Sequence, residues 1–193
     1  KHPYPEDFRK SIIRFTKVDL NWFFDQWLET SKIIDYKIKR VKKIAKDSFQ
    51  ITFKRIGEMQ MPIDFEVVSY ADSVIKYHIP NTWFIKKTEA VTLPKWYGWG
   101  KFNSEYKVKL HVPEGIFNIQ IDPSGRLADI TPLNNSLKLP YLIEFDSQLR
   151  SFPDRQNYVI KLKPDVLWNS YDGLKIGFNW KSSFFNIRKK VDA

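Results

Sequence analysis

The chain has 193 residues and a formal net charge of +10, from 32 Lys+Arg against 22 Asp+Glu. This length suits one domain or slightly more, and a hydrophobic fraction of 42% is too high for a disordered chain. The absence of cysteine excludes disulfides, thiol nucleophiles and Cys-ligated metal centres. No apolar run approaches the roughly 18 residues that cross a bilayer as a helix, so we predict no transmembrane segment. Because the chain begins at Lys1 without Met, we expect it to be part of a longer protein.

Residues 1–31 have the apolar periodicity of two short helices. Pro5, Glu6 and Asp7 suit a first helical turn, because Pro lacks the N–H that would be unpaired there and acids favour the positive end of the helix dipole. Asp19 is an N-cap candidate for the second helix. An apolar stripe follows at spacings of three and four, made of Leu20, Phe23, Phe24, Trp27 and Leu28. We expect the first four to pack against another domain, or to cause weak self-association where that domain is missing.

After Ser31 the sequence alternates with the period of β-strands. Phe49, Ile51 and Phe53 alternate with polar residues, and prolines separate the runs. The predicted strands are 33–46, 49–56, 63–70, 74–79, 106–112 and 116–121, with further strand patterns at 158–163 and 174–181. Residues 131–136 are predicted to be a linker and residues 122–125 a type I turn. Short strands without intervening helices favour an antiparallel sandwich.

The sequence contains no complete catalytic constellation. The three histidines, His2, His78 and His111, form no His-x-x-x-His pair, and a histidine in a strand is more often hydrogen-bonded or on the surface than a metal ligand. Asp122 and Asp129 flank a turn without the spacing of a calcium loop, so we interpret both as turn caps. Asp64 and Glu66 fall on one strand face and are interpreted as solvated acids. We therefore predict no catalytic and no metal-binding residue in this chain.

The segment from Trp96 to Gly100 is rich in aromatic residues and glycine. Exposed rings next to flexible glycines can stack on sugars or peptides, so Trp96, Tyr97 and Trp99 form a candidate platform for a ligand or partner. The alternative is that the rings pack against the sandwich or a neighbouring domain. The basic clusters at 37–46 and 188–190 are interpreted as solvated faces, and nucleic acid is not expected as a partner.

Several motifs together resemble one protein family. The quoted segments are Asp7-Phe8-Arg9-Lys10, Asp19-Leu20-Asn21-Trp22-Phe23-Phe24-Asp25-Gln26-Trp27-Leu28-Glu29-Thr30 and Asp35-Tyr36. They resemble the end of the catalytic domain of bacterial aminopeptidase N-like gluzincin zinc metallopeptidases. Residues 55–64 and 121–130 resemble the opening strands and the closing strand of the immunoglobulin-like sandwich that follows that domain. The resemblance covers residues 7–135, and residues 171–177 resemble extensions of some long members.

The resemblance implies a mainly β fold, with two short α-helices before an immunoglobulin-like antiparallel β-sandwich and a β-rich C-terminal extension. The implied domains are the helical end of the thermolysin-like catalytic domain (1–31), the sandwich (32–135) and the extension (136–193). Family members bind zinc through His-Glu-x-x-His and a more distant Glu, and none of these motifs is found here. The zinc would belong to the parent enzyme, and this fragment is expected to hold no cofactor.

The resemblance thus implies a non-catalytic C-terminal part of a zinc aminopeptidase. Its sandwich would support the catalytic domain of the same chain and bound the cleft for the peptide substrate. The alternative is a stand-alone β-sandwich that binds carbohydrate or peptide through the aromatic loop. The family context favours a bacterial periplasm or cell envelope, with the cytoplasm left open.

Overall fold

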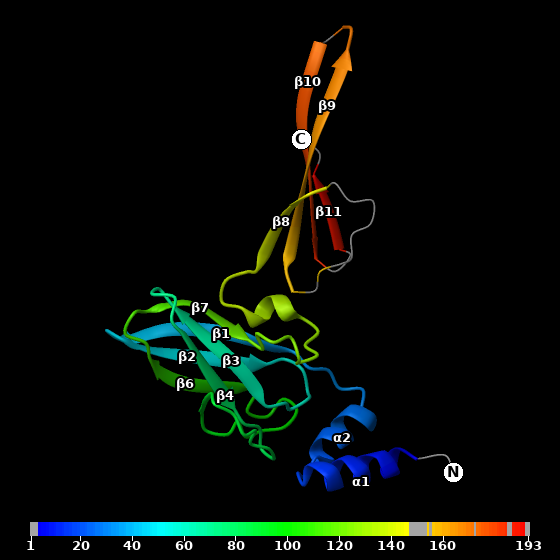
Figure 1. Cartoon of the computed structure of the whole chain (residues 1–193). Helices are drawn as coiled ribbons and strands as arrows, with labels where there is room; N and C mark the ends of the chain where they lie inside the picture. The colour runs from blue at the N-terminus through cyan, green and yellow to red at the C-terminus, as the bar shows by residue number, and fades with distance from the viewer. Residues whose placement is uncertain (1–3, 147–153, 155, 172, 185–186, 192–193) are drawn as a thin grey trace. The chain divides into compact units, whose positions relative to one another are not determined.

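The computed structural model describes residues 4–146, 154, 156–171, 173–184 and 187–191, so His2 and Asp172 lie outside the described residues. The chain divides into two compact units, Lys1–Thr131 and Pro132–Ala193, which we describe separately as the N-terminal and C-terminal units. Figure 1 shows the elements of both units in chain order. The fold is mainly β with two helices, which confirms the predicted class. The immunoglobulin-like subtype stays a prediction.

The two predicted helices are present at the start of the N-terminal unit. Helix α1 spans Pro5–Thr16 and helix α2 spans Asn21–Leu28. Pro5 opens α1 as predicted, and the Asp7 carboxylate accepts a hydrogen bond from the Tyr4 N–H at 3.1 Å. The N-cap of α2 is Leu20 rather than Asp19, and the Asp19 carboxylate accepts from the Asn21 N–H at 3.0 Å. Asp19 therefore supports the first turn from one position upstream.

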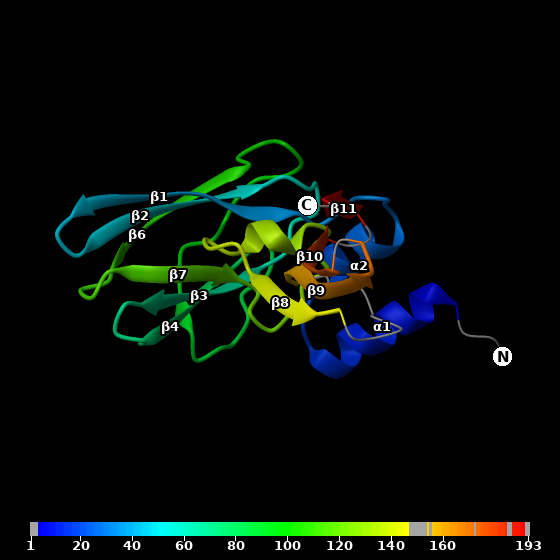
Figure 2. The ribbon, with the colours of Figure 1, turned by 90° about the horizontal axis from the view of Figure 1, so that it is seen from above.

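Seven strands of the N-terminal unit form two sheets. The first sheet has the order β1-β2-β6, and the second has the order β5-β4-β3-β7. Their bounds are β1 Tyr36–Ala45, β2 Ser48–Arg55, β3 Ile63–Ser69, β4 Val74–Ile79, β5 Val91–Thr92, β6 Glu105–His111 and β7 Ile116–Ile121. All pairs are antiparallel except the short parallel contact of β4 with β5. Figure 2 shows the two sheets as separate layers.

The core lies between these two sheets. Strands β3 and β6 alternate strictly between buried and less buried residues, as expected for strands with one face on a core. Phe53 of β2 meets Phe65 of β3 across the layers, with ring centroids 4.8 Å apart. The fully buried apolar side chains from both sheets include Ile51, Phe53, Phe65, Val67, Ile79, Ile119 and Ile121. The N-terminal unit is therefore a β-sandwich with a continuous apolar core.

The segment before β1 closes one end of the sandwich by main-chain contacts. The Asp35 carbonyl accepts from the N–H groups of Ile56 and Gly57, and the Ile33 carbonyl accepts from that of Met59. A Cβ atom at Gly57 would lie 2.3 Å from the Ile33 carbonyl oxygen, which is inside contact distance. This close approach requires glycine at position 57.

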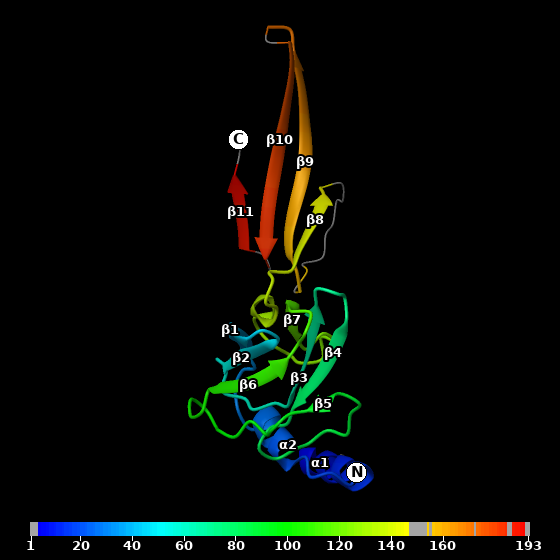
Figure 3. The same ribbon diagram turned by 90° about the vertical axis from the view of Figure 1, so that its left-hand side faces the viewer.

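The C-terminal unit contains a third sheet. It begins with a 3-10 helix at Pro132–Asn135, within the segment predicted as a linker. The strand order is β11-β10-β9-β8, with β8 at Tyr141–Phe145, β9 at Tyr158–Asn169, β10 at Gly173–Phe184 and β11 at Ile187–Val191. Strands β8 and β9 pair in parallel, and the other pairs are antiparallel. Figure 3 shows β9 and β10 continuing past the ends of β8 and β11. Both long strands extend beyond their predicted ranges.

Candidate functional site

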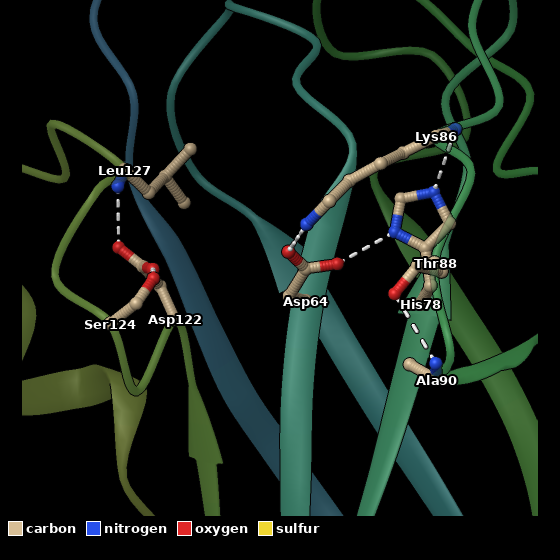
Figure 4. Close-up of polar contacts among 8 residues, drawn as sticks. All are labelled: Asp64, His78, Lys86, Thr88, Ala90, Asp122, Ser124 and Leu127. Carbon is tan, nitrogen blue, oxygen red and sulfur yellow. Dashed lines mark hydrogen bonds and ion pairs between the residues drawn. The ribbon is translucent and has the colours of Figure 1, made fainter.

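A cluster of charged and polar side chains lies on the sheet that contains β3 and β4. Asp64 on β3 and His78 on β4 are cross-strand partners, and His78 Nδ1 lies 2.7 Å from an Asp64 carboxylate oxygen. The other carboxylate oxygen accepts from Lys86 Nζ at 2.7 Å. The main-chain N–H of Lys86 donates to His78 Nε2 at 3.4 Å. Figure 4 shows this chain of contacts from Lys86 through Asp64 to His78.

The hydrogen bonds define the protonation of the imidazole. Because Nε2 accepts from a main-chain N–H, the proton sits on Nδ1 and is donated to Asp64. His78 is only 1% exposed, so neither ring nitrogen is available to a substrate. An Asp–His pair serves as a general base only when the second nitrogen faces the reacting group. This pair is therefore structural, in agreement with the prediction that the histidine is hydrogen-bonded.

The structure corrects the prediction that Asp64 is an ordinary solvated acid, because its carboxylate contacts both His78 and Lys86. The hydrogen bond from His78, helped by the pairing with Lys86, lowers the pKa of Asp64 to about 2. The carboxylate is therefore ionised over the whole physiological range. It lines an open pocket of about 190 Å³ whose other charged lining residues are Lys86, Asp122 and Arg126. The pocket is small and of mixed charge.

The turn at residues 122–125 forms one wall of this pocket. The Gly125 N–H donates to the Asp122 carbonyl at 3.0 Å, which closes the predicted turn. The Asp122 carboxylate accepts from the Ser124 hydroxyl and from the Leu127 N–H, as Figure 4 shows. Asp129 accepts from the N–H groups of Tyr36 and Thr131 at 2.9 and 2.8 Å. Both acids act as caps for main-chain N–H groups, as the sequence predicted.

The aromatic loop separates into a buried ring and exposed rings. Trp96 is 5% exposed, and its Nε1 donates to the Asn103 carbonyl at 2.8 Å. It packs against Tyr36 and Tyr106 and so belongs to the core rather than to a platform. Trp99 is 69% exposed and stacks on Phe102, with centroids 5.2 Å apart and planes at 25°. Tyr97 is exposed as well, so the exposed rings are Tyr97, Trp99 and Phe102.

A buried arginine holds this loop. Arg55 is 3% exposed, and its guanidinium donates to the carbonyls of Gly100 and Phe102 at 2.9 and 3.1 Å. The guanidinium also lies over the Trp96 ring, 5.7 Å from its centroid. Burial lowers the pKa of Arg55 from its ordinary value. Arg55 is not among the predicted site residues. It lies two residues after Phe53 and four after Ile51 on β2, so strand alternation places its side chain on the same, buried face as theirs.

Helix α2 contacts the sandwich through an aromatic cluster and one glutamine. Trp22 is buried and stacks on Trp83, with centroids 6.1 Å apart, and on Phe84. The Gln26 amide exchanges hydrogen bonds with the Gln60 main chain, whose N–H reaches Gln26 Oε1 at 2.7 Å. Trp22 lies outside the stripe that the periodicity selected. Its burial follows from its contacts with Trp83 and Phe84 of the sandwich, which local periodicity does not reveal.

The four residues expected to pack against another domain are placed differently from one another. Phe24 is buried, with the Phe8 ring of α1 at its edge. Leu20 and Phe23 are partly exposed, and Trp27 is exposed. Phe15 of α1 is 88% exposed, and no residue of α1 is buried. The helical pair therefore presents several large apolar side chains to solvent.

Neither a metal centre nor a membrane-spanning helix emerges from the part of the chain that the structure describes. Within it, no three His, Asp or Glu side chains converge as metal ligands. No helix there combines the length and the hydropathy needed to cross a bilayer.

Comparisons with known proteins identify no relative. No protein family, no curated protein and no solved structure matches the chain.

Proposed function

We propose that the chain is a non-catalytic accessory part of a zinc-dependent aminopeptidase. Its sandwich would support the catalytic domain and bound the cleft in which that domain cleaves N-terminal residues from peptides. The zinc and the catalytic groups would be held by the catalytic domain of the same protein. The proposal extends the resemblance of residues 7–135 to that family.

One observation carries the proposal, which is the exposed apolar surface of the helical pair. Trp22 and Gln26 of α2 fix the pair to the sandwich. Phe8, Phe15 and Leu28 remain exposed. Exposed apolar side chains on a short helical pair are typical of a surface that is covered in the intact protein. The helices would thus join the sandwich to a domain on their other side.

A first experiment reads the coding sequence upstream of the codon for Lys1. The proposal expects an open frame that encodes His-Glu-x-x-His and a downstream Glu. The purified 193-residue chain, incubated with zinc, is expected neither to bind the metal stoichiometrically nor to hydrolyse leucine p-nitroanilide. A stop codon upstream, or an open frame without the zinc motif, would contradict the proposal.

A second experiment tests the docking role of the helices in the longer protein. Phe15→Ala is expected to destabilise the contact with the catalytic domain by about 2 kcal/mol there, as for a buried aromatic anchor. In the 193-residue chain the same change is expected to alter the free energy of unfolding by less than about 0.5 kcal/mol, because the ring is exposed. Lys10→Ala, on another side of α1, is the matched control. Equal effects of Phe15→Ala in both proteins would exclude docking through this side.

The exposed stack of Trp99 on Phe102 favours a second candidate function, a sandwich that binds carbohydrate or peptide. Two stacked and exposed rings offer a flat face of the kind that sugars and extended peptides contact. Tryptophan fluorescence titration with a panel of soluble glycans and peptides tests this function. The function predicts a saturable change in the wild-type chain that is lost in Trp99→Ala and kept in Trp83→Ala. A flat titration with every ligand would exclude it.

A further inference from the structure

The sheet of the C-terminal unit has one continuous apolar face. Cross-strand partners lie on the same face of a sheet, and the β9–β10 pairs Trp168–Leu174, Val166–Ile176, Pro164–Phe178 and Leu162–Trp180 are all apolar. The parallel partner β8 extends the face through Tyr141 and Ile143, which pair with Tyr158 and Ile160. We call this set of residues the apolar face.

The apolar face is exposed along most of its length. Leu174, Ile176 and Phe178 are each more than half exposed, and so are Val166 and Trp168 on the neighbouring strand. Soluble proteins rarely leave so many adjacent large apolar side chains uncovered. The exposure is thus the main feature that a function of this unit has to explain.

The geometry of the hairpin strengthens this point. Strand β8 pairs with Tyr158–Leu162 of β9, and β11 pairs with Trp180–Phe184 of β10. Among the described residues, the outer half of the β9–β10 hairpin is therefore a two-stranded ribbon, as Figure 3 shows. A two-stranded ribbon is only marginally stable in water and gains stability when its apolar side is covered. This ribbon carries half of the residues of the apolar face.

The opposite face of the β9–β10 hairpin is mainly polar and carries four lysines. These are Lys161, Lys163, Lys175 and Lys181, which alternate with the residues of the apolar face. Lys163 lies 3.8 Å from Asp165, and Lys181 lies 3.1 Å from Asp146. Leu167 is the exposed apolar residue on this side of the hairpin. The β9–β10 hairpin is therefore amphipathic, with aromatic and aliphatic residues on one face and lysines, two of them near Asp146 and Asp165, on the other.

From these observations we propose that the apolar face binds to the surface of an anionic lipid bilayer. A polypeptide element lies in the headgroup region when one face carries Trp, Phe and Leu and the other carries Lys or Arg. Tryptophan and tyrosine favour this depth, and the apolar face or its turn contributes Trp168, Trp180, Tyr141, Tyr158 and Tyr171. The lysines of the opposite face then point to the water, where they add to the net positive charge that an anionic surface attracts.

Charge favours a lipid surface over a second copy of the chain. The whole chain carries a net charge of +10, and residues 132–193 contain ten Lys+Arg against six Asp+Glu. Two copies that met through their apolar faces would bring like net charges together, whereas an anionic bilayer attracts the same charge. The apolar face and the net charge thus favour the same partner.

The proposal is tested by sedimentation of the 193-residue chain with vesicles. Vesicles made of equal parts phosphatidylcholine and phosphatidylglycerol are compared with vesicles of phosphatidylcholine alone. Ile176→Lys places a charge on the apolar face. Gly177→Lys places the same charge on the adjacent, opposite face, where a new Cβ meets no atom within 4 Å. Circular dichroism checks that both variants keep their strands.

The wild-type chain and Gly177→Lys are expected to sediment with the mixed vesicles, and less with phosphatidylcholine alone. The Ile176→Lys variant is expected to bind the mixed vesicles on the order of tenfold more weakly. It lacks the aliphatic side chain that moves from water into the lipid surface when the wild-type chain binds. The proposal is overturned if the wild-type chain binds neither vesicle, or if both variants bind alike. It is also overturned if high salt alone releases all of the protein, which would show adsorption through charge only.

Analytical ultracentrifugation without lipid tests whether a second copy of the chain covers the apolar face instead. A dimer that Ile176→Lys dissociates and Gly177→Lys preserves, in a protein that does not bind vesicles, would assign the apolar face to a second copy and reject the lipid surface.

Discussion

The two units of the chain use similar strands but treat their apolar faces differently. In the N-terminal unit the inward residues of β2 and β3 meet a second sheet, and Phe53 and Phe65 are fully buried. In the C-terminal unit β9 and β10 alternate in the same way, yet Val166, Ile176 and Phe178 stay exposed. The alternation of apolar and polar residues thus defines a face in both units, and a second layer covers that face in only one of them.

The same alternating pattern therefore contributes differently to stability in the two units. A strand in the sandwich gains free energy because its apolar side chains leave water, at roughly 25 cal/mol per Å². An exposed strand gains little until a partner covers it. Mutations of matched residues in the two units should therefore have very different effects, and the following predictions use that contrast.

The largest expected effect is the loss of a core aromatic ring. Phe53→Ala is expected to lower the free energy of unfolding of the N-terminal unit by about 3–5 kcal/mol, because it leaves a cavity beside Phe65. Phe178→Ala, in the exposed sheet, is expected to change stability by less than about 0.5 kcal/mol. Urea unfolding followed by tryptophan fluorescence measures both. Similar losses for the two variants would mean that the apolar face is covered in solution.

A smaller effect is expected where the backbone is crowded. Gly57→Ala is expected to destabilise the sandwich by about 2 kcal/mol, because the new methyl group collides with the main chain at Ile33 and Asp35. Gly177→Ala in β10 is the control, since nothing lies near its added Cβ and alanine suits a strand at least as well. Thermal unfolding compares the two. A neutral Gly57→Ala would show that the segment before β1 is not held against residues 56–59.

The smallest effect is electrostatic and depends on pH. The pKa of Asp64 is lowered to about 2 in the folded protein, below its value of about 4 in an unfolded chain. Ionised Asp64 therefore stabilises the fold above about pH 4, and this contribution disappears as the pH falls towards 2. Asp64→Asn is expected to cost about 1 kcal/mol at neutral pH, a modest value because the carboxylate is partly exposed.

Denaturant unfolding at several pH values measures this contribution. The stability difference between the wild-type chain and Asp64→Asn should narrow between pH 4 and pH 2. A difference that stays constant over this range would contradict the assigned origin of the shift. Lys86→Met should reduce the pH-dependent stabilisation by Asp64 less than His78→Phe does. The reason is that the hydrogen bond from His78 is the larger cause of the lowered pKa of Asp64.

Much of the N-terminal unit could be predicted from its sequence because local patterns agree with the tertiary structure there. The strands 74–79 and 116–121 were predicted with the bounds that the structure has. Strand β5 has only two residues, and it exists because it pairs with β4. Strand β8 pairs in parallel with β9, the next strand of the chain, and no local pattern reveals this parallel pairing. Elements defined by their partners are therefore the ones that sequence reasoning missed.

The candidate sites were harder to predict for the same reason. The aromatic loop was recognised, but its residues were assigned together, whereas the structure buries Trp96 and exposes Trp99. The missing signal was Arg55, whose contacts with carbonyls 45 and 47 residues away decide which rings face outward. Asp64 was interpreted without its partner His78, which is brought alongside by strand pairing. Pairings of this kind are distant in sequence and need the register of the sheet.

The way in which Arg55 holds the aromatic loop has a consequence for protein engineering. Its two hydrogen bonds go to main-chain carbonyls, which every amino acid provides. The side chains at positions 99 and 102 can therefore be replaced without removing the groups that anchor the loop. Positions 99 and 102 are thus natural sites for a randomised library, with Gly100 kept because its φ of 50° favours glycine. The buried arginine then keeps the shape of the loop constant while its surface chemistry changes.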